Sequence, residues 1–151
     1  MVRCVLSKIL AENKVLYLDV DTIVTGDISE LWYTNIYDNY IAAVPECGEY
    51  YNSGVMLMNL EYMRKHNSSE ALCSFLESRI YTFPDQEAIN NVFAGKIRKL
   101  PPKFNAWNLT KDPYATPFAI RHFTGIDKPW SSNPQDLRDV ELWNRYFTTE
   151  V

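Results

Sequence analysis

A short apolar segment that ends in two closely spaced aspartates constrains this sequence more than any other feature. Residues 15–18 read Val-Leu-Tyr-Leu, and Asp19 and Asp21 follow them directly. A short, wholly apolar run that stops at acidic residues is typical of a strand buried on both faces of a mostly parallel sheet. Ligands of such sheets bind at the carboxyl ends of the strands. The sequence therefore predicts a buried strand with a functional site at its end.

The rest of the chain alternates between strand and helix patterns, which favours an α/β fold. Helical spacing of apolar residues predicts helices over 2–10, over 60–80 with a break near 66–68, from Pro84 to Gly95, and after Pro134. Apolar runs predict strands at 40–44, 54–60 and 118–123, whereas residues 97–117 are rich in proline, asparagine and aromatic residues and indicate an irregular segment.

Composition supports one globular domain and excludes several classes of function. Hydrophobic residues make up 46% of the 151 residues, which is enough to form a core. A formal net charge of −4 without a basic block disfavours nucleic-acid binding. No apolar run approaches the ~18 residues of a membrane-spanning helix, and no signal-peptide-like block follows the first residues. Three cysteines without metal-ligand spacing indicate reduced thiols, and we expect a cytoplasmic chain.

Asp19 and Asp21 form the first part of a predicted metal site. Side chains alternate along a strand, so the two carboxylates point the same way and repel each other unless a cation lies between them. His122, at the end of the last expected strand, would complete an oxygen-and-nitrogen ligand set suited to Mn²⁺. Gly125 would let the backbone approach a ligand closely, and Lys128 would bring positive charge to a diphosphate. Each residue taken singly also has an ordinary structural explanation.

Four motifs resemble those of the family 8 glycosyltransferases in order and spacing, and the resemblance spans nearly the whole chain. The matching segments are 16–21, 51–60, 85–86 and 122–130. They are similar to the family's Asp-x-Asp strand, its Asn-(Ser/Ala)-Gly strand, its Asp-Gln motif and its carboxyl-terminal signature. Members of the family include bacterial lipopolysaccharide galactosyl- and glucosyltransferases, glycogenin and galacturonosyltransferases.

The resemblance implies a GT-A fold, in which a mostly parallel mixed sheet is flanked by helices. It also implies retaining transfer of a hexose from a UDP-sugar to a saccharide or glycolipid acceptor, as in lipopolysaccharide biosynthesis. Asp19, Asp21 and His122 would hold Mn²⁺, or Mg²⁺ in its place.

The resemblance assigns further roles residue by residue. The implied donor-binding residues are Arg3, Asp19, Asp21, Asn52, Asp85, Gly125 and Lys128. Asp85 would also act in catalysis together with Gln86, which would lie beside the anomeric carbon. Two mechanisms stay open: Gln86 attacks the sugar covalently, or the acceptor enters on the face that the leaving group departs from.

Members of the family begin with a strand, helix and strand block that binds uracil and ribose, and this sequence starts after its counterpart. We therefore expect residues 1–151 to form a single partial catalytic domain, truncated at its amino terminus, whose activity as an isolated chain is an open question. An incomplete sheet would expose an unpaired strand edge, through which copies of the chain could form a homo-oligomer.

Two alternative functions also fit parts of the sequence. One is a degenerate, non-catalytic sugar-binding module in which Trp107 and Trp130 stack on a sugar. The other is a haloacid dehalogenase-like phosphatase with Asp19 as nucleophile and Asp21 as general acid. The phosphatase needs a further acidic pair to complete a Mg²⁺ site, and Asp136 and Asp139 are the candidates that the sequence offers.

Overall fold

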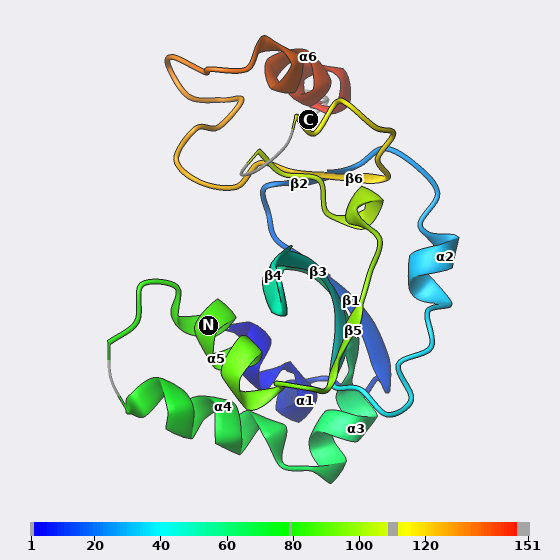
Figure 1. Cartoon of the computed structure of the whole chain (residues 1–151), viewed down its shortest axis with the longest axis vertical. Coiled ribbons are helices and arrows are strands. Elements are labelled where there is room, and N and C mark those ends of the chain that lie inside the picture. Colours follow the sequence, from blue (N-terminus) through cyan, green and yellow to red (C-terminus); the bar gives the residue numbers. More distant parts are fainter. Residues whose placement is uncertain (1, 79, 109–111, 148–151) are drawn as a thin grey trace.

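A four-stranded sheet and a separate two-stranded ribbon form the frame of the molecule (Figure 1). The computed structural model describes residues 2–78, 80–108 and 112–147. The large sheet contains β1 (Lys14–Leu18), β4 (Tyr50–Asn59), β3 (Ile41–Cys47) and β5 (Ile97–Lys99), in that spatial order. The ribbon pairs β2 (Thr22–Val24) with β6 (Ile120–His122).

Helices cover both faces of the large sheet, and one helix lies on the ribbon (Figure 1). One face carries the 3₁₀ helix η1 (Val2–Val5), α1 (Leu6–Ile9), α3 (Leu60–Lys65), α4 (Ser68–Glu77) and α5 (Pro84–Val92). The opposite face carries α2 (Ser29–Trp32) and the 3₁₀ helix η2 (Pro102–Phe104). The closing helix α6 (Leu137–Tyr146) packs on the ribbon through Leu142 and Trp143.

The central strand β4 shows why both faces of the sheet are covered. Met56 and Met58 belong to the apolar cluster beneath η1 and the helices α3 to α5, whereas Val55 and Leu57 belong to the cluster on the other face. All four side chains are buried. This follows from the two-residue period of a strand, which places successive side chains on opposite faces. The four successive apolar residues 55–58 of β4 therefore need an apolar layer on each face of the sheet.

The sheet is mixed and flanked by helices, as the sequence predicts, but parallel pairing is the exception among the described strands. β1 pairs antiparallel with β4, β3 with β4 and β2 with β6, and only β3 and β5 are parallel. The expectation of a mostly parallel sheet is therefore wrong for this part of the chain. The reason is local: two residues connect β3 to β4, with Gly48 at a φ of 58°, and a parallel pair needs a much longer crossover.

β1 differs in burial from the expected strand. All five of its residues are half-buried, because β1 lies at one edge of the large sheet and pairs on one side with β4. The prediction of a strand buried on both faces is therefore wrong for β1 and fits β4 instead. In the part of the chain that the structure describes, the outer edge of β1 has no partner strand, which agrees with the expected unpaired edge.

Most predicted helices are present. The amino-terminal helix is split into η1 and α1, and the predicted break between α3 and α4 occurs at Asn67, whose φ is 51°. The strands β2 and β5 were not expected, because strands of three residues are too short to give a periodic pattern. None of the described helices is long and apolar enough to cross a membrane.

Candidate functional site

Asp19 and Asp21 lie in the turn that joins the large sheet to the ribbon. The backbone N–H of Asp19 donates to the carbonyl of Gly54 at 2.8 Å, which extends the pairing of β1 with β4. The carbonyl of Asp21 accepts from the N–H of Phe123 at 2.9 Å, next to the pairing of β2 with β6. Thr22 Oγ1 closes the turn by donating to the carbonyl of Asp19 at 2.8 Å. The aspartates are thus held by different sheets, in a turn and not along one strand.

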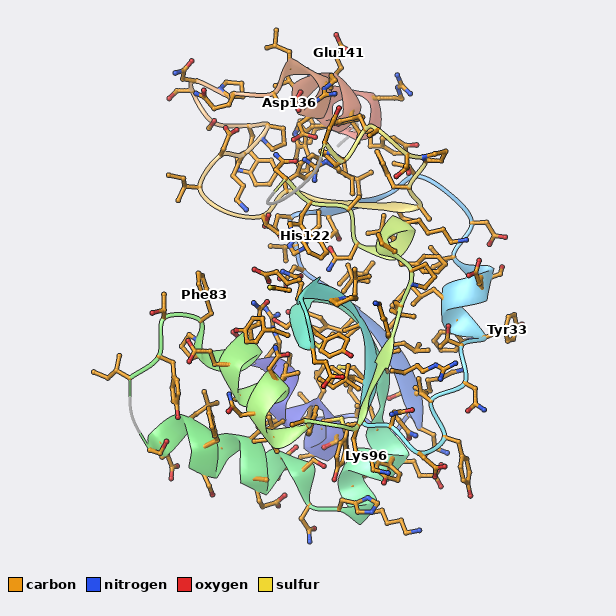
Figure 2. All side chains as sticks on the ribbon, viewed as in Figure 1. Tyr33, Phe83, Lys96, His122, Asp136 and Glu141 are labelled. Carbon is orange, nitrogen blue, oxygen red and sulfur yellow. The ribbon has the colours of Figure 1, made fainter. Side chains whose placement is uncertain are left out.

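His122 brings a nitrogen to these two carboxylates, as the sequence predicts. It is the last residue of β6, it pairs with Thr22 across the ribbon, and its side chain is buried. Its Nε2 lies 3.3 Å from Asp21 Oδ1 and 3.8 Å from Asp19 Oδ2. The three potential ligand atoms lie within 4.8 Å of one another, and Figure 2 shows His122 between the ribbon and the large sheet. Two carboxylate oxygens and an imidazole nitrogen fit a Mn²⁺ or Mg²⁺ ion.

Gly54 makes room for the His122 ring. A Cβ atom at this position would lie 2.0 Å from Cε1 and 2.7 Å from Nδ1 of His122. Any other residue at position 54 would therefore displace the imidazole from the two aspartates. The glycine of the Asn-Ser-Gly motif thus has a structural role at the Asp-Asp-His cluster, which the sequence did not reveal.

Arg3 joins two carboxylates at one side of the cluster. Its Nη2 donates to Asp19 Oδ1 at 2.7 Å, its Nε lies 2.9 Å from Asp85 Oδ2, and its Nη1 donates to the Ser53 carbonyl at 2.8 Å. The guanidinium also lies 4.7 Å from the centre of the Tyr17 ring. Tyr17 donates to Asp19 Oδ1 at 2.8 Å, and burial together with this hydrogen bond raises the pKa of Tyr17 to about 12. Asp19 is therefore held by two donors.

Lys128 contacts the other aspartate. Its Nζ lies 2.5 Å from Asp21 Oδ2 and also donates to the carbonyl of Phe123. Burial opposes ionisation of Asp21, but the contacts with His122 and Lys128 outweigh it and hold the pKa of Asp21 well below its usual value. Gly125 lies in the same loop with a φ of 82°, so the loop needs a glycine there for its conformation.

Asp85 and Gln86 lie in the first turn of α5, which begins at Pro84. Both ends of the Gln86 amide are engaged: Oε1 accepts from the backbone N–H of Ser53 at 3.0 Å, and Nε2 donates to Glu46 Oε2 at 3.1 Å. The Asp-Gln motif is thereby fixed to β4 and to the end of β3. Glu46 was not expected at the site, because a single acidic residue near a strand end carries no distinctive pattern.

The predicted site residues converge on one cavity. Its volume is about 290 Å³, and its lining includes Arg3, Asp19, Asp21, Asn52, Asp85, Gln86, His122 and Gly125. Lys128 reaches the same place through Asp21. Glu46 and Ser53 also line the cavity, and Asn105 hydrogen-bonds Nδ1 of His122 at 2.9 Å; no role at the site could be assigned to these three residues from the sequence. A second cavity of about 260 Å³ also has Glu46 in its lining, next to Asn105 and Trp107.

The two acids needed for a phosphatase site lie elsewhere. Asp136 caps α6 by accepting from the backbone N–H of Arg138 at 3.0 Å. Asp139 is buried against Arg121, with a shortest separation of 2.6 Å. Neither residue lines the cavity of Asp19 and Asp21, and Figure 2 shows Asp136 at the far end of the molecule from the large sheet. Asp136 and Asp139 are therefore not placed to complete a Mg²⁺ site with Asp19 and Asp21.

The tryptophans expected in a sugar-binding module have different surroundings. Trp130 is 48% exposed, and its ring centre lies 4.4 Å from that of Trp143 on α6. Trp107 is half-buried and lines the second cavity. Trp130 thus has a packing role in the carboxyl-terminal part, whereas Trp107 remains available to a ligand beside Glu46.

Comparison with known proteins gives a consistent result. The sequence profile described as glycosyl transferase family 8 matches residues 2–134. The chain is 29% identical to general stress protein A of Bacillus subtilis, over 80% of this chain and 54% of that protein. It is 31% identical to a lipopolysaccharide 1,2-glucosyltransferase of Escherichia coli, over 78% of this chain and 44% of that protein. The chain spans about half the length of the curated relatives it matches.

Solved structures agree with this match. The crystal structure of the glycosyltransferase GlyE of Streptococcus pneumoniae superposes with a TM-score of 0.84 at 26% sequence identity. The superposition covers 97% of this chain and 43% of that protein. The similarity thus includes both the large sheet and the ribbon that meet at the Asp-x-Asp turn.

Proposed function

The chain belongs to glycosyltransferase family 8 and has the GT-A fold, and on this premise we propose that it transfers a hexose from a UDP-sugar to a saccharide or glycolipid acceptor with retention of configuration. The observation that carries the proposal is the convergence of Asp19, Asp21 and His122, whose ligand atoms lie within 4.8 Å of one another. This cluster lies in a cavity that is also lined by Arg3, Asn52, Asp85 and Gly125, and Lys128 contacts Asp21.

Asp19, Asp21 and His122 are the proposed metal ligands, with Mn²⁺ as the preferred ion and Mg²⁺ as the substitute. A divalent cation held there would supply Lewis-acid stabilisation to the departing diphosphate. Lys128 adds a second positive charge beside Asp21, where negative charge develops on the leaving group. Gly125 would present backbone to the diphosphate from the same loop, since it lines the cavity.

Asn52 and Asp85 are proposed to bind the donor sugar. Asn52 Oδ1 is occupied by hydrogen bonds from Gly54 and Asn105, so its Nδ2, which has no partner among the described residues, is the group left to meet a sugar hydroxyl. Arg3 holds Asp85 through one carboxylate oxygen and thereby fixes its orientation in the cavity. Both groups would act on a sugar that gains oxocarbenium character during transfer.

The surroundings of Gln86 favour attack by the acceptor on the leaving-group face. An amide oxygen that already accepts a backbone hydrogen bond is poorly placed to act as a nucleophile. In the favoured mechanism, the bond from the anomeric carbon to the diphosphate breaks and the acceptor oxygen bonds to that carbon. The proton of the acceptor hydroxyl passes to the departing diphosphate oxygen. In this mechanism Gln86 lies beside the anomeric carbon and forms no covalent bond to the sugar.

The acceptor is proposed to enter beside Glu46. This residue lines both the cavity of the metal ligands and the second cavity, and it contacts the Gln86 amide. Its carboxylate can accept from sugar hydroxyls, and Trp107 in the second cavity offers an aromatic face. A saccharide in the second cavity could therefore present a hydroxyl to the donor across Glu46.

The cellular setting is part of the same proposal. The three cysteines are free, which fits a reducing compartment, and we propose a cytoplasmic location and a role in the assembly of a lipopolysaccharide-like saccharide. The unpaired edge of β1 is the proposed route to any homo-oligomer.

The test measures release of UDP from UDP-glucose and UDP-galactose by this chain in the presence and absence of Mn²⁺. We expect release that depends on Mn²⁺ and is lost in Asp21→Asn. Asp27→Asn serves as the matched control, because Asp27 is exposed and hydrogen-bonds its neighbour Ser29. Sugar binding that needs no metal and is unchanged in Asp21→Asn would instead support the non-catalytic module.

A further inference from the structure

The imidazole of His122 has one nitrogen toward the carboxylates and one toward the protein interior. Nε2 faces Asp19 and Asp21, and Nδ1 lies 2.9 Å from Asn105 Oδ1. A neutral imidazole can bind a cation only through the nitrogen that carries no proton. Whether Nε2 is available to a metal therefore depends on whether the single N–H proton of the neutral ring is held on Nδ1.

A short chain of hydrogen bonds decides the role of each atom on the Nδ1 side. It starts at the backbone N–H of Gly54, which can only donate, and which lies 2.9 Å from Asn52 Oδ1. This contact fixes the orientation of the Asn52 amide. The same oxygen lies 2.9 Å from Asn105 Nδ2, which must therefore be the amide nitrogen that donates to it. The oxygen of Asn105 is then left for His122.

Asn105 Oδ1 can only accept, so the hydrogen atom in its contact with His122 belongs to Nδ1. Asn105 is 1% exposed, His122 is 3% exposed and Asn52 is 7% exposed, so solvent has little access to replace any of these bonds. The backbone N–H of Asn105 donates to the Pro102 carbonyl at 3.0 Å, which anchors the residue at the end of η2. The amide thus has one orientation, set by protein groups alone.

We propose that Asn105 is a positioning residue, which keeps a proton on Nδ1 of His122 and reserves Nε2 for a divalent cation. The inference rests on the proposed function for the identity of the ligand, but the position of the proton can be tested without a metal. It also gives Asn52 a second role, because the side chain expected to meet the donor sugar sets the orientation of the amide behind the metal ligand.

The first test is ¹⁵N NMR of the imidazole rings in the metal-free protein at about pH 8, above the ordinary pKa of histidine. His66→Gln provides the background, since the chain has two histidines and this change leaves one. We expect Nδ1 of His122 to be protonated and its proton to exchange slowly. Asn105→Leu, which has similar volume and no acceptor, should lose the slowly exchanging proton. Asn105→Asp loses the hydrogen bond to Asn52 Oδ1 but keeps an acceptor for Nδ1, and should retain the proton.

The second readout is the affinity for Mn²⁺ alone. Loss of a group that orients a metal ligand typically lowers metal affinity about 10–100-fold, which is the decrease expected in Asn105→Leu. Asn105→Asp should recover most of the affinity. Asn91→Leu is the matched control, because Asn91 is exposed on α5 and bonds within its own helix.

Two results would overturn the inference: an unprotonated Nδ1 in the parent protein, or a proton on Nδ1 that exchanges equally slowly in Asn105→Leu. If the NMR result is as expected but the parent protein binds no Mn²⁺, the role of Asn105 in holding the proton is supported and the proposed function fails. The experiments can therefore refute either proposal without refuting the other.

Discussion

The two parts of the molecule that meet at the Asp-x-Asp turn are stabilised by different interactions. The large sheet is enclosed by two apolar clusters, one on each face, in which strands and helices contribute buried aliphatic side chains. The cluster between the ribbon and α6 has only Ile23, Phe123 and Leu142 as buried apolar members among the described residues. The ribbon part therefore depends more strongly on polar contacts.

The main polar contact of the ribbon part is a buried ion pair. Arg121, on β6 next to His122, has no exposed surface. Its Nε and Nη2 lie 2.8 and 2.6 Å from the two carboxylate oxygens of Asp139 on α6. Its Nη1 donates to the carbonyls of Ala106 and His122, each at 2.7 Å. The guanidinium thus joins α6 to the strand that carries a proposed metal ligand.

This difference shows that the site depends on both kinds of interaction. Asp19 is anchored to the apolar sheet through Gly54, whereas His122 is anchored to the ribbon and its ion pair. The proposed metal site should therefore respond to changes in either part. Changes to the ion pair of the ribbon part should be strongly damaging, since removal of one partner leaves the other charge buried without compensation.

The largest effect is expected from Arg121→Met. Removal of Arg121 leaves the Asp139 carboxylate buried without its cation and with the Tyr114 hydroxyl as a remaining donor at 2.6 Å, which should lower the free energy of unfolding by about 3–5 kcal/mol. The double variant Arg121→Met/Asp139→Leu should be clearly more stable than the single one, because no charge remains unpaired. Urea unfolding measures both. Equal destabilisation in the single and double variants would show that the unpaired charge of Asp139 is not the cause of the loss of stability.

Gly54→Ala tests the contact between the two parts. Its Cβ would overlap the His122 ring, so we expect Mn²⁺ affinity to fall about 10–100-fold, as for other changes that misplace a metal ligand. Gly48→Ala is the matched control, since no atom lies within 4 Å of its added Cβ. The control should cost about 1–2 kcal/mol through its positive φ and leave Mn²⁺ affinity unchanged. Equal Mn²⁺ binding by both variants would contradict the account.

Cys4 gives a pH-dependent test of the sheet part. Burial, with a smaller contribution from Asp85, raises the pKa of the Cys4 thiol from 9.0 to about 11. The thiol therefore loses its proton at lower pH in the unfolded chain than in the folded one. Its contribution to the free energy of unfolding is complete below about pH 9 and is lost as the pH rises toward 11. Cys4→Ala should therefore lose less stability over this window than the parent protein, by about 2–3 kcal/mol. Parallel pH profiles for the parent and the variant would exclude this contribution.

The smallest effect concerns Lys128. Its Nζ occupies Asp21 Oδ2, and a partly buried ion pair of this kind is worth about 1 kcal/mol. A metal ion must compete with this contact, so Lys128→Met should raise the affinity for Mn²⁺ alone about fivefold and weaken binding of UDP with Mn²⁺. Lys103→Met, which breaks an exposed pair with Glu30, should change neither quantity. Calorimetric titrations measure both. Weaker Mn²⁺ binding in Lys128→Met would be the opposite of the expected result.

Much of the site could be predicted from the sequence because its charged residues lie in short, distinctive motifs. Asp19, Asp21 and His122 were expected to meet, and they do. The way in which they are brought together was not predicted. The sequence predicts that both aspartates follow one strand, whereas in the structure they lie in a turn between two sheets. The strand β2 that makes this turn is too short to give a pattern.

The supporting residues could not be predicted, because their roles depend on contacts between distant segments. Asn105 lies in a segment whose composition indicated only irregular structure, and its partners are Asn52 and His122. Arg121 precedes His122 in the sequence, but its ion pair with Asp139 depends on the packing of α6. The prediction of a mostly parallel sheet was wrong because the short turn at Gly48 folds β4 back onto β3 as an antiparallel neighbour.

A calorimetric titration of UDP into this chain with and without Mn²⁺, repeated with Asp21→Ala, tests most directly whether the Asp-Asp-His cluster binds a cation together with a nucleoside diphosphate. We expect binding that requires Mn²⁺ in the parent protein and is lost in the variant, because Asp21 Oδ1 and His122 Nε2, which lie 3.3 Å apart, are the proposed ligands of one cation. UDP binding that is independent of Mn²⁺, or that is equal in the parent and in Asp21→Ala, would contradict it.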